Sequence, residues 1–260
     1  MPVDGQAGPA VQNPLIARDV NALMEGAASQ VVTLVRDAVA ARGRFAWALS
    51  GGSTPRQLYA LLASAPFVSQ IDWSKVHFFW GDERCVPPDH EDSNYRMVRQ
   101  ALLDVVRPAT SQVHRLRGEI DPEEAALAYE AELRAFFQAA PGAAPPSFDL
   151  VLLGMGGDGH TASLFPGTPA LNETRRWIVA NQKAADEPMR LTFTLPLINA
   201  AAQIRFLVSG ANKAGRVEQV MDDVPAAESD RLPAQLVRPS RGVLQWWLDE
   251  DAASLLEHPR

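Results

Sequence analysis

Residues 148–165 read Phe148-Asp-Leu-Val-Leu-Leu-Gly-Met-Gly-Gly-Asp-Gly-His-Thr-Ala-Ser-Leu-Phe165, an apolar run that passes directly into a glycine-rich loop. The continuous apolar run at 150–153 is typical of a parallel strand that is covered on both faces. The glycines behind it allow positive φ angles or a close approach of the backbone to a ligand. We therefore expect Asp158 and His160 to stand at the carboxyl end of a central, buried strand.

The same loop matches the pattern G-x-G-x-x-G at 154–159, which is the fingerprint of dinucleotide-binding folds. That fingerprint requires a long helix after the third glycine and an acid about 20 residues further on, at the end of the next strand. Here Pro166 interrupts the chain, and Glu173 precedes the next strand-like run at 177–180. We therefore expect the match to be accidental.

Strand-like and helix-like segments alternate along the chain, which indicates an α/β fold with a mostly parallel central sheet flanked by helices in a modified Rossmann-like arrangement. The expected strands are 45–49, 76–80, 150–153, 177–180, 190–195, 204–208 and 243–248. The expected helices are 17–42, 95–106, 123–139, 196–202 and a terminal helix near 252–256. In such sheets ligands bind outside the carboxyl ends of the strands, so the polar loops 50–54, 82–84, 158–160 and 209–213 should converge.

Length and composition limit the class of protein. A chain of 260 residues with 47% apolar residues can bury one large core, and we expect a single catalytic domain over 15–258 after a flexible N-terminus at 1–14. No run approaches the roughly 18 apolar residues of a membrane span, and the N-terminus lacks the regions of a secretory signal. These features favour a cytoplasmic protein, either a monomer or a small homo-oligomer.

The formal charge of −7 argues against nucleic acid as a partner, because phosphate backbones are bound by basic surfaces. A small anionic ligand remains compatible with this charge if cations gather locally. The single cysteine, Cys85, excludes an internal disulfide and is typical of a small buried residue, with a nucleophile as the less common alternative.

The segment Ser50-Gly-Gly-Ser-Thr-Pro-Arg-Gln57 follows a strand and resembles a helix start, with Thr54 as N-cap, Pro55 in the first helical position and Gln57 completing a capping box. Free backbone N–H groups and hydroxyls at such a start can hold a phosphate. An ordinary capped helix is the alternative. A hydrolase nucleophile elbow, G-x-S-x-G, is excluded because Pro55 takes its fifth position.

Taken together, these segments resemble a known family. The resemblance is carried by Leu49-Ser-Gly-Gly-Ser-Thr-Pro55, Trp80-Gly-Asp-Glu-Arg84 and Gly154-Met-Gly-Gly-Asp-Gly-His-Thr-Ala-Ser-Leu-Phe-Pro166. They are similar to the 6-phosphogluconolactonases of the glucosamine-6-phosphate isomerase/6-phosphogluconolactonase family, over roughly residues 15–255. The glucosamine-6-phosphate deaminases share the pattern more loosely and typically continue toward Ala-Phe-Asn-Glu-Pro after the histidine.

This resemblance implies a sugar-phosphate isomerase/deaminase-like fold and the hydrolysis of 6-phospho-D-glucono-1,5-lactone to 6-phospho-D-gluconate in the oxidative pentose phosphate pathway. The alternatives are a deaminase or isomerase acting on an amino-sugar phosphate, and a sugar-phosphate sensor that binds without turnover. Against the sensor, no basic helix-turn-helix segment precedes Phe45.

A lactone is an ester, so its opening needs an activated water, donors for the oxyanion and a proton for the leaving oxygen. Imidazole titrates near neutrality, and His160 is the candidate general base. Asp158 could orient it or be a turn-forming residue. Asp82 could contact sugar hydroxyls or cap the next segment, and Arg84 could contact the phosphate, the carbonyl or a structural acid.

For the phosphate, the candidates are the loop residues Ser50, Gly51, Gly52, Ser53 and Thr54, with cations supplied by Arg190 and Lys213. Lys183 matches a lysine of the lactonase pattern, and the resemblance implies that it neutralises substrate charge. Each cation taken singly could instead be an ordinary surface charge.

We expect no metal and no cofactor. No two histidines have the H-E-x-x-H spacing of a helical metal site. His77, His90, His114 and His258 are interpreted as structural or surface residues.

Overall fold

The structure is a computed structural model that describes residues 10–11, 13–221, 231–239 and 241–256. Its central feature is an eight-stranded sheet of order β1-β11-β10-β7-β3-β4-β6, with β2 also paired to β11, and every recorded pairing is parallel. The strands are β1 Ala10–Val11, β2 Leu15–Ala17, β3 Phe45–Leu49, β4 Val76–Trp80, β6 Val113–His114, β7 Leu150–Leu153, β10 Gln203–Val208 and β11 Val243–Asp249. The expected parallel sheet is confirmed, and β3 and β7 are buried at every position, as covered strands should be.

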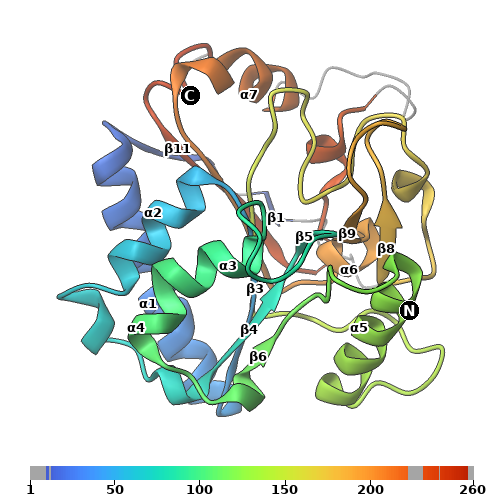
Figure 1. The fold of residues 1–260 in the computed structure, drawn as a ribbon. Helices are drawn as coiled ribbons and strands as arrows, with labels where there is room; N and C mark the ends of the chain where they lie inside the picture. Colours follow the sequence, from blue (N-terminus) through green and yellow to red (C-terminus); the bar gives the residue numbers. More distant parts are fainter. Residues whose placement is uncertain (1–9, 12, 222–230, 240, 257–260) are drawn as a thin grey trace, which may run out of the picture.

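Helices cover both faces of this sheet, with α1 to α4 on one side and α5 and α6 on the other (Figure 1). Their bounds are α1 Val20–Arg42, α2 Ser53–Leu62, α3 Asn94–Val98, α4 Asp104–Val106, α5 Pro122–Phe137, α6 Leu195–Asn199 and α7 Ala214–Met221. A π-helical turn, Arg99–Leu103, joins α3 to α4. The long helix α1 has clear local signals, since the Asp19 side chain accepts from the Ala22 N–H and Gly43 ends the helix at φ 73°.

A second, three-stranded sheet lies beside the first and is antiparallel, with the order β5-β9-β8. It consists of β5 Asp82–Arg84, β9 Arg190–Phe193 and β8 Ile178–Asn181. The strands expected at 177–180 and 190–195 therefore exist, but they leave the parallel sheet. The chain turns out of that sheet after β4 at Gly81, whose carbonyl accepts from the Phe193 N–H at 2.8 Å.

One expected helix is confirmed with a later start, and one helix expectation was wrong. The helix expected at 17–42 begins only at Val20, because Leu15–Ala17 pairs with β11 as a strand. Residues 252–256 form turns instead of a terminal helix. There the Asp249 carboxylate accepts from the N–H groups of both Ala252 and Gly210, and so ties the end of β11 to the loop after β10.

The N-terminal expectation falls mostly on residues 1–9 and 12, which lie outside the described residues. Ala10–Val11 pairs in parallel with Val243 and Leu244 of β11. A single catalytic domain over 15–258 stays a prediction, and its residues 222–230, 240 and 257–258 also lie outside the described part. Within the described ranges, no helix has the length and apolar character needed to cross a membrane.

Candidate active site

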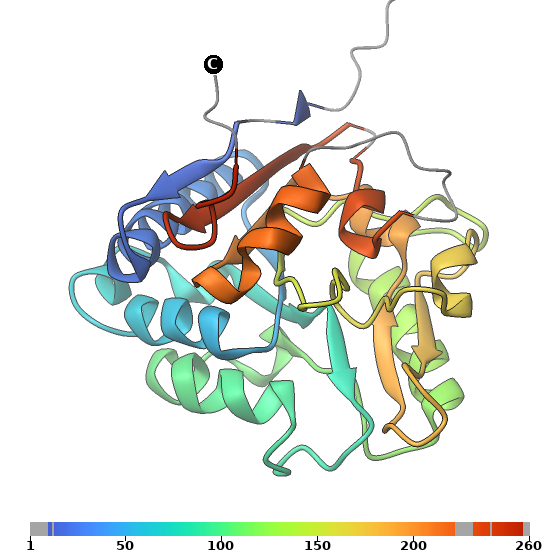
Figure 2. The same ribbon diagram turned by 90° about the horizontal axis from the view of Figure 1, so that it is seen from above.

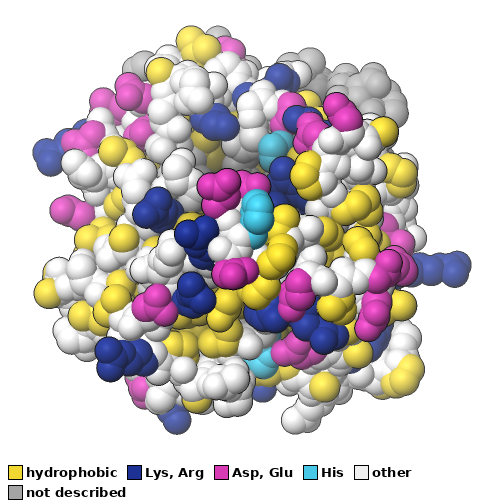
Figure 3. All heavy atoms as spheres, in the orientation of Figure 1, with side chains coloured by type: hydrophobic (Ala, Val, Ile, Leu, Met, Phe, Trp, Pro, Cys, Tyr) yellow, Lys and Arg dark blue, Asp and Glu magenta, His cyan; other side chains and the backbone are white. Residues whose placement is uncertain are grey.

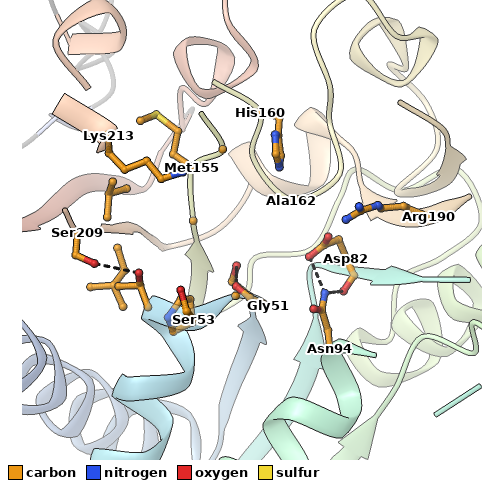
Figure 4. Close-up of a pocket in the computed structure, with 18 of the residues that line it drawn as sticks. Gly51, Ser53, Asp82, Asn94, Met155, His160, Ala162, Arg190, Ser209 and Lys213 are labelled. Atoms are coloured by element: carbon orange, nitrogen blue, oxygen red, sulfur yellow. Dashed lines mark hydrogen bonds between the residues drawn. The ribbon is translucent and has the colours of Figure 1, made fainter. Parts of the chain in front are cut away.

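A cavity of about 210 Å³ opens at the carboxyl ends of β3, β4, β7 and β10 (Figure 4). Loops distant in sequence meet there, as expected for a parallel sheet. The cavity is lined by Ser50, Gly51, Gly52, Ser53, Thr54, Pro55, Asp82, Arg84, Asn94, Gly154, Met155, Gly156, His160, Ala162, Arg190, Leu207, Val208, Ser209 and Lys213. Of the candidate residues, only Asp158 and Lys183 are outside this lining.

The loop after β7 is folded tightly around its histidine. The Gly156 N–H donates to the His160 carbonyl at 2.9 Å, and the Thr161 hydroxyl donates to the Gly154 carbonyl at 2.9 Å. A Cβ atom at Gly156 would lie 2.1 Å from the His160 ring, so only glycine leaves room for the imidazole. Gly159 has φ 82°, a conformation that L side chains rarely adopt.

His160 and Asp158 form a close pair, with 2.5 Å between the histidine Nδ1 and the Asp158 Oδ1. Burial opposes ionisation of Asp158, but the hydrogen bond and charge of His160, together with Lys183, lower the pKa of this carboxyl to about 2. A carboxylate only accepts, so Nδ1 carries the proton and Nε2 of the neutral ring is left as an acceptor. The ring points into the cavity in Figure 4 and packs against Phe165, with 4.8 Å between ring centroids.

Lys183 contacts this pair through Asp158. Its Nζ is 3.2 Å from Oδ2 of Asp158, the carboxylate oxygen that His160 does not use. The structure therefore places it on an acid outside the cavity lining, and not among the residues that could touch a ligand there.

Burial and hydrogen bonds fix the Asp82 side chain at the cavity. It is 6% exposed, and its Oδ2 accepts from the Ser163 hydroxyl at 2.7 Å. The Asn94 amide donates to the Asp82 carbonyl at 3.0 Å and to its Oδ1 at 3.3 Å. Of the two roles left open for Asp82, the lining position favours contact with a ligand.

Arg84 and Arg190 face each other as direct partners of the antiparallel pair β5 and β9. Arg84 Nη1 donates to the Asp92 carbonyl at 2.8 Å, while its buried Nε lacks a partner. Burial and the neighbouring Arg84 charge lower the pKa of Arg190, whose guanidinium lies 5.5 Å from the Phe165 ring centroid. Two adjacent cations of this kind favour an anion between or beside them.

The other cationic side consists of Lys213 and the start of α2. Helix α2 begins at Ser53 with Gly52 as N-cap and no side-chain cap bond, so Thr54 is not the N-cap. Its hydroxyl instead meets the Ser209 hydroxyl at 3.0 Å and joins the loops after β3 and β10. The first N–H groups of α2 are consequently free of a capping side chain.

Lys213 and Arg190 lie on opposite sides of His160 in Figure 4. Among the described residues, neither takes part in a recorded ion pair with an acid. Both are therefore available to a ligand.

Sequence reasoning missed several residues of the site, namely Asn94, Ser163, Phe165 and Ser209. Asn94 also packs against the loop after β3, since a Cβ at Gly51 would lie 1.9 Å from its Oδ1. Ser209 falls within an expected polar loop and Ser163 within the quoted motif, but nothing local shows that Ser163 would bind an acid 81 positions away.

The remaining histidines lie elsewhere. His77 and His114 are at the β4 and β6 edge, where Nδ1 of the first is 3.2 Å from Nε2 of the second, and Glu132 holds His114 at 2.6 Å. His90 is 3.7 Å from Asp92 on an exposed loop, and His258 lies outside the described residues. No group of three or more potential metal ligands occurs in the described ranges.

Cys85 is half-buried, and burial, with the nearby carboxylates of Glu83 and Asp121, raises the pKa of its thiol to about 11. A thiol with so high a pKa is a poor nucleophile at neutral pH.

The fold is that of an α/β protein, and its cavity contains a histidine paired with an acid. This pair lies between two groups that can attract an anion: Lys213 with the start of α2, and Arg84 with Arg190. Residues 18–246 match the model of the family described as glucosamine-6-phosphate isomerases/6-phosphogluconolactonase, and the chain belongs to this family. The 6-phosphogluconolactonase of Synechocystis sp. is 46% identical over 235 residues, which cover 90% of this chain and 94% of the relative.

Solved structures agree with this membership. The 6-phosphogluconolactonase from Trypanosoma cruzi has a TM-score of 0.83 at 28% identity and covers 97% of this chain and 99% of its own. A monomeric glucosamine-6-phosphate deaminase has a TM-score of 0.76 at 20% identity, with 95% and 99% covered, and this likeness shows the fold alone.

Proposed function

We propose that the protein hydrolyses 6-phospho-D-glucono-1,5-lactone to 6-phospho-D-gluconate, a step of the oxidative pentose phosphate pathway. One observation carries the proposal: His160 presents Nε2 to a small cavity while Asp158 holds Nδ1 at 2.5 Å. The names of the relatives at high identity and coverage support the same substrate.

In this mechanism Nε2 of His160 takes a proton from a water as the water oxygen attacks C1 of the lactone. Negative charge then develops on the carbonyl oxygen, and cations near the carbonyl stabilise it. When the bond from C1 to the ring oxygen breaks, the imidazolium returns the proton to that oxygen. The chemistry is complete with an imidazole, a carboxylate and cations, and requires neither metal nor cofactor.

The two cationic sides suggest an orientation for the substrate. Lys213 follows β10, which is three strand spacings of about 4.8 Å each from β4, and Arg84 and Arg190 lie beyond β4. The α2 start follows β3, which lies between β10 and β4 in the sheet. A helix start with free N–H groups and a lysine suits the phosphate. Arg84 and Arg190 then lie closer to the lactone carbonyl and to the carboxylate that forms from it, which revises the expectation that Arg190 binds the phosphate.

The partner in this proposal is a small sugar-phosphate lactone and not a nucleic acid. On the face shown in Figure 3, basic side chains are interspersed with acidic ones and do not gather into one stripe. We also propose a cytoplasmic protein, supported by its single cysteine, and a monomer or small homo-oligomer.

The test is a stopped-flow measurement of lactone decay with and without the protein, because such lactones also open unaided. Acceleration that follows protein concentration supports the proposal. Decay at the unaided rate contradicts it, and ammonia release from glucosamine 6-phosphate would point instead to the deaminase activity.

A further inference from the structure

The side chains of His160, Asp158 and Lys183 form a continuous polar chain that leads from the cavity lining to residues outside it. His160 Nδ1 meets Oδ1 of Asp158 at 2.5 Å, and Oδ2 of the same carboxylate meets Lys183 Nζ at 3.2 Å. The His160 backbone N–H also points to Oδ1, at 3.2 Å. Oδ1 is thus shared by two donors of one residue, and Lys183 is the recorded partner of Oδ2.

The loop that carries Lys183 is fixed to the same part of the molecule. At the end of β8, Asn181 donates to the Ser163 carbonyl at 2.8 Å and to the Thr168 hydroxyl at 3.0 Å. Gln182 then closes the loop by donating to the Glu187 carbonyl at 2.6 Å. The lysine is therefore presented to Asp158 by anchored backbone on both sides of the contact.

We propose that Lys183 is a positioning residue that acts on His160 through Asp158, and that it does not bind substrate. Its ammonium holds Oδ2 and so fixes the plane of the carboxylate, which keeps Oδ1 aligned with the imidazole. It also offsets part of the negative charge that Asp158 places next to the ring. This inference rests on the proposed function only for its kinetic consequences, because the geometry can be tested without turnover.

The direction of the electrostatic effect follows from the charges around the ring. Asp158 on the same loop and Asp82 on β5 favour protonated imidazole, whereas Lys183, Arg84, Arg190 and Lys213 disfavour it. Without the Lys183 ammonium, less positive charge offsets the negative charge that Asp158 places next to His160. Protonated imidazole then persists to higher pH, and the base-competent form becomes available only at higher pH.

The size of the effect is set by solvent exposure. The Lys183 and Asp158 side chains are 43% and 32% exposed, so screening weakens the pair. A pair of this exposure corresponds to a shift of about half a pH unit or less. Substrate affinity should change little, because Lys183 is not part of the cavity lining.

The test is an NMR titration of the His160 Cε1–H signal in the wild type, Lys183→Met and Lys183→Arg, with His160→Asn used to assign the signal. We expect the midpoint to rise by about 0.2–0.5 pH unit in Lys183→Met and to return toward the wild-type value in Lys183→Arg. Lys75→Met removes an exposed lysine elsewhere and serves as the matched control. An unmoved midpoint in Lys183→Met would overturn the proposal.

Two further arms separate this role from its rivals. In an Asp158→Asn background, adding Lys183→Met should no longer move the midpoint, and a shift of equal size there would mean that Lys183 acts directly. In kinetic measurements on Lys183→Met, the acid limb of kcat/KM should move with the NMR midpoint, and KM should change less than about two-fold. A large rise in KM for the phosphorylated lactone would instead make Lys183 a substrate ligand. Failure of the wild type to accelerate lactone opening would remove the proposed function but leave the NMR result standing.

Discussion

At the scale of single residues, the proposed mechanism depends on which nitrogen of His160 is free. Asp158 engages Nδ1, and Nε2 is left to take a proton from water. Replacing His160 with Asn keeps a polar side chain of similar size but removes proton transfer. We expect kcat to fall about 10²-fold to 10⁴-fold while ligand binding survives, as measured by stopped-flow kinetics and calorimetry.

The pH profile provides an independent check on this assignment. In the wild type, kcat/KM should decline at acid pH, because a protonated imidazole cannot accept a proton. The Asn variant should lose that acid limb. Near-normal turnover with an unaltered limb would make His160 structural, and Asp82 would become the next candidate for the base.

Lys213 and Arg190 should differ in their kinetic effects, because they lie on opposite sides of His160. Lys213→Ala should raise KM for the phosphorylated lactone by about 10-fold to 100-fold, the loss of one charged hydrogen bond, and leave hydrolysis of unphosphorylated gluconolactone nearly unchanged. Arg190→Ala should mainly lower kcat on both substrates. Identical patterns for the two variants would contradict the proposed orientation of the substrate.

At the scale of elements, the loop after β7 requires glycine at one position and tolerates a side chain at the next. A Cβ at Gly156 would lie 2.1 Å from the His160 ring, whereas a Cβ at Gly157 would meet nothing within 4 Å. Gly156→Ala should therefore displace the imidazole, lower kcat at least about ten-fold and cost roughly 1–3 kcal/mol of stability.

Gly157→Ala is the matched control, with the same chemical change in the same loop, and should stay close to wild type in both assays. Equal activity of the two variants in lactone kinetics would show that the loop adapts and that the fit around His160 is not decisive.

The outer side of this loop is also supported by later elements. Figure 2 shows α7 and the 3-10 turn Pro233–Leu236 next to the loop after β7. Arg216 of α7 donates to the Gly157 carbonyl at 3.0 Å, and the Ala234 N–H donates to the Gly159 carbonyl at 3.1 Å. The loop after β7 is therefore held by these later elements as well as by its own turns.

At the scale of the whole molecule, binding and folding should be linked, because the cavity joins loops from four neighbouring strands of the parallel sheet with residues of the antiparallel sheet. We expect one cooperative unfolding transition in calorimetry, as for a single domain. The product 6-phosphogluconate at 100 times its Kd should stabilise the fold by about 2.7 kcal/mol, which raises Tm by roughly 4–8 °C.

The same concentration of unphosphorylated gluconate should have a much smaller effect on Tm, and Lys213→Ala should lose most of the shift. Two separate transitions, only one of them moved by ligand, would contradict the single catalytic domain expected over 15–258.

The sequence alone determined the parallel sheet, its main helices and the convergence of the polar loops. These features are encoded locally: an apolar run such as 150–153 specifies a covered strand, and glycines and an N-cap such as Asp19 mark where strands and helices end. Because parallel strands share one carboxyl edge, the meeting of Ser50, Asp82 and His160 followed from the order of elements.

Only the tertiary structure decided the pairings between distant segments. It moved β8 and β9 into an antiparallel sheet with β5, which brought Arg84 opposite Arg190. It also placed Lys183 on Asp158 instead of in the cavity, and Asn94 against Asp82. Such contacts depend on how packed elements orient their side chains, and no local pattern of hydrophobicity or spacing specifies that orientation.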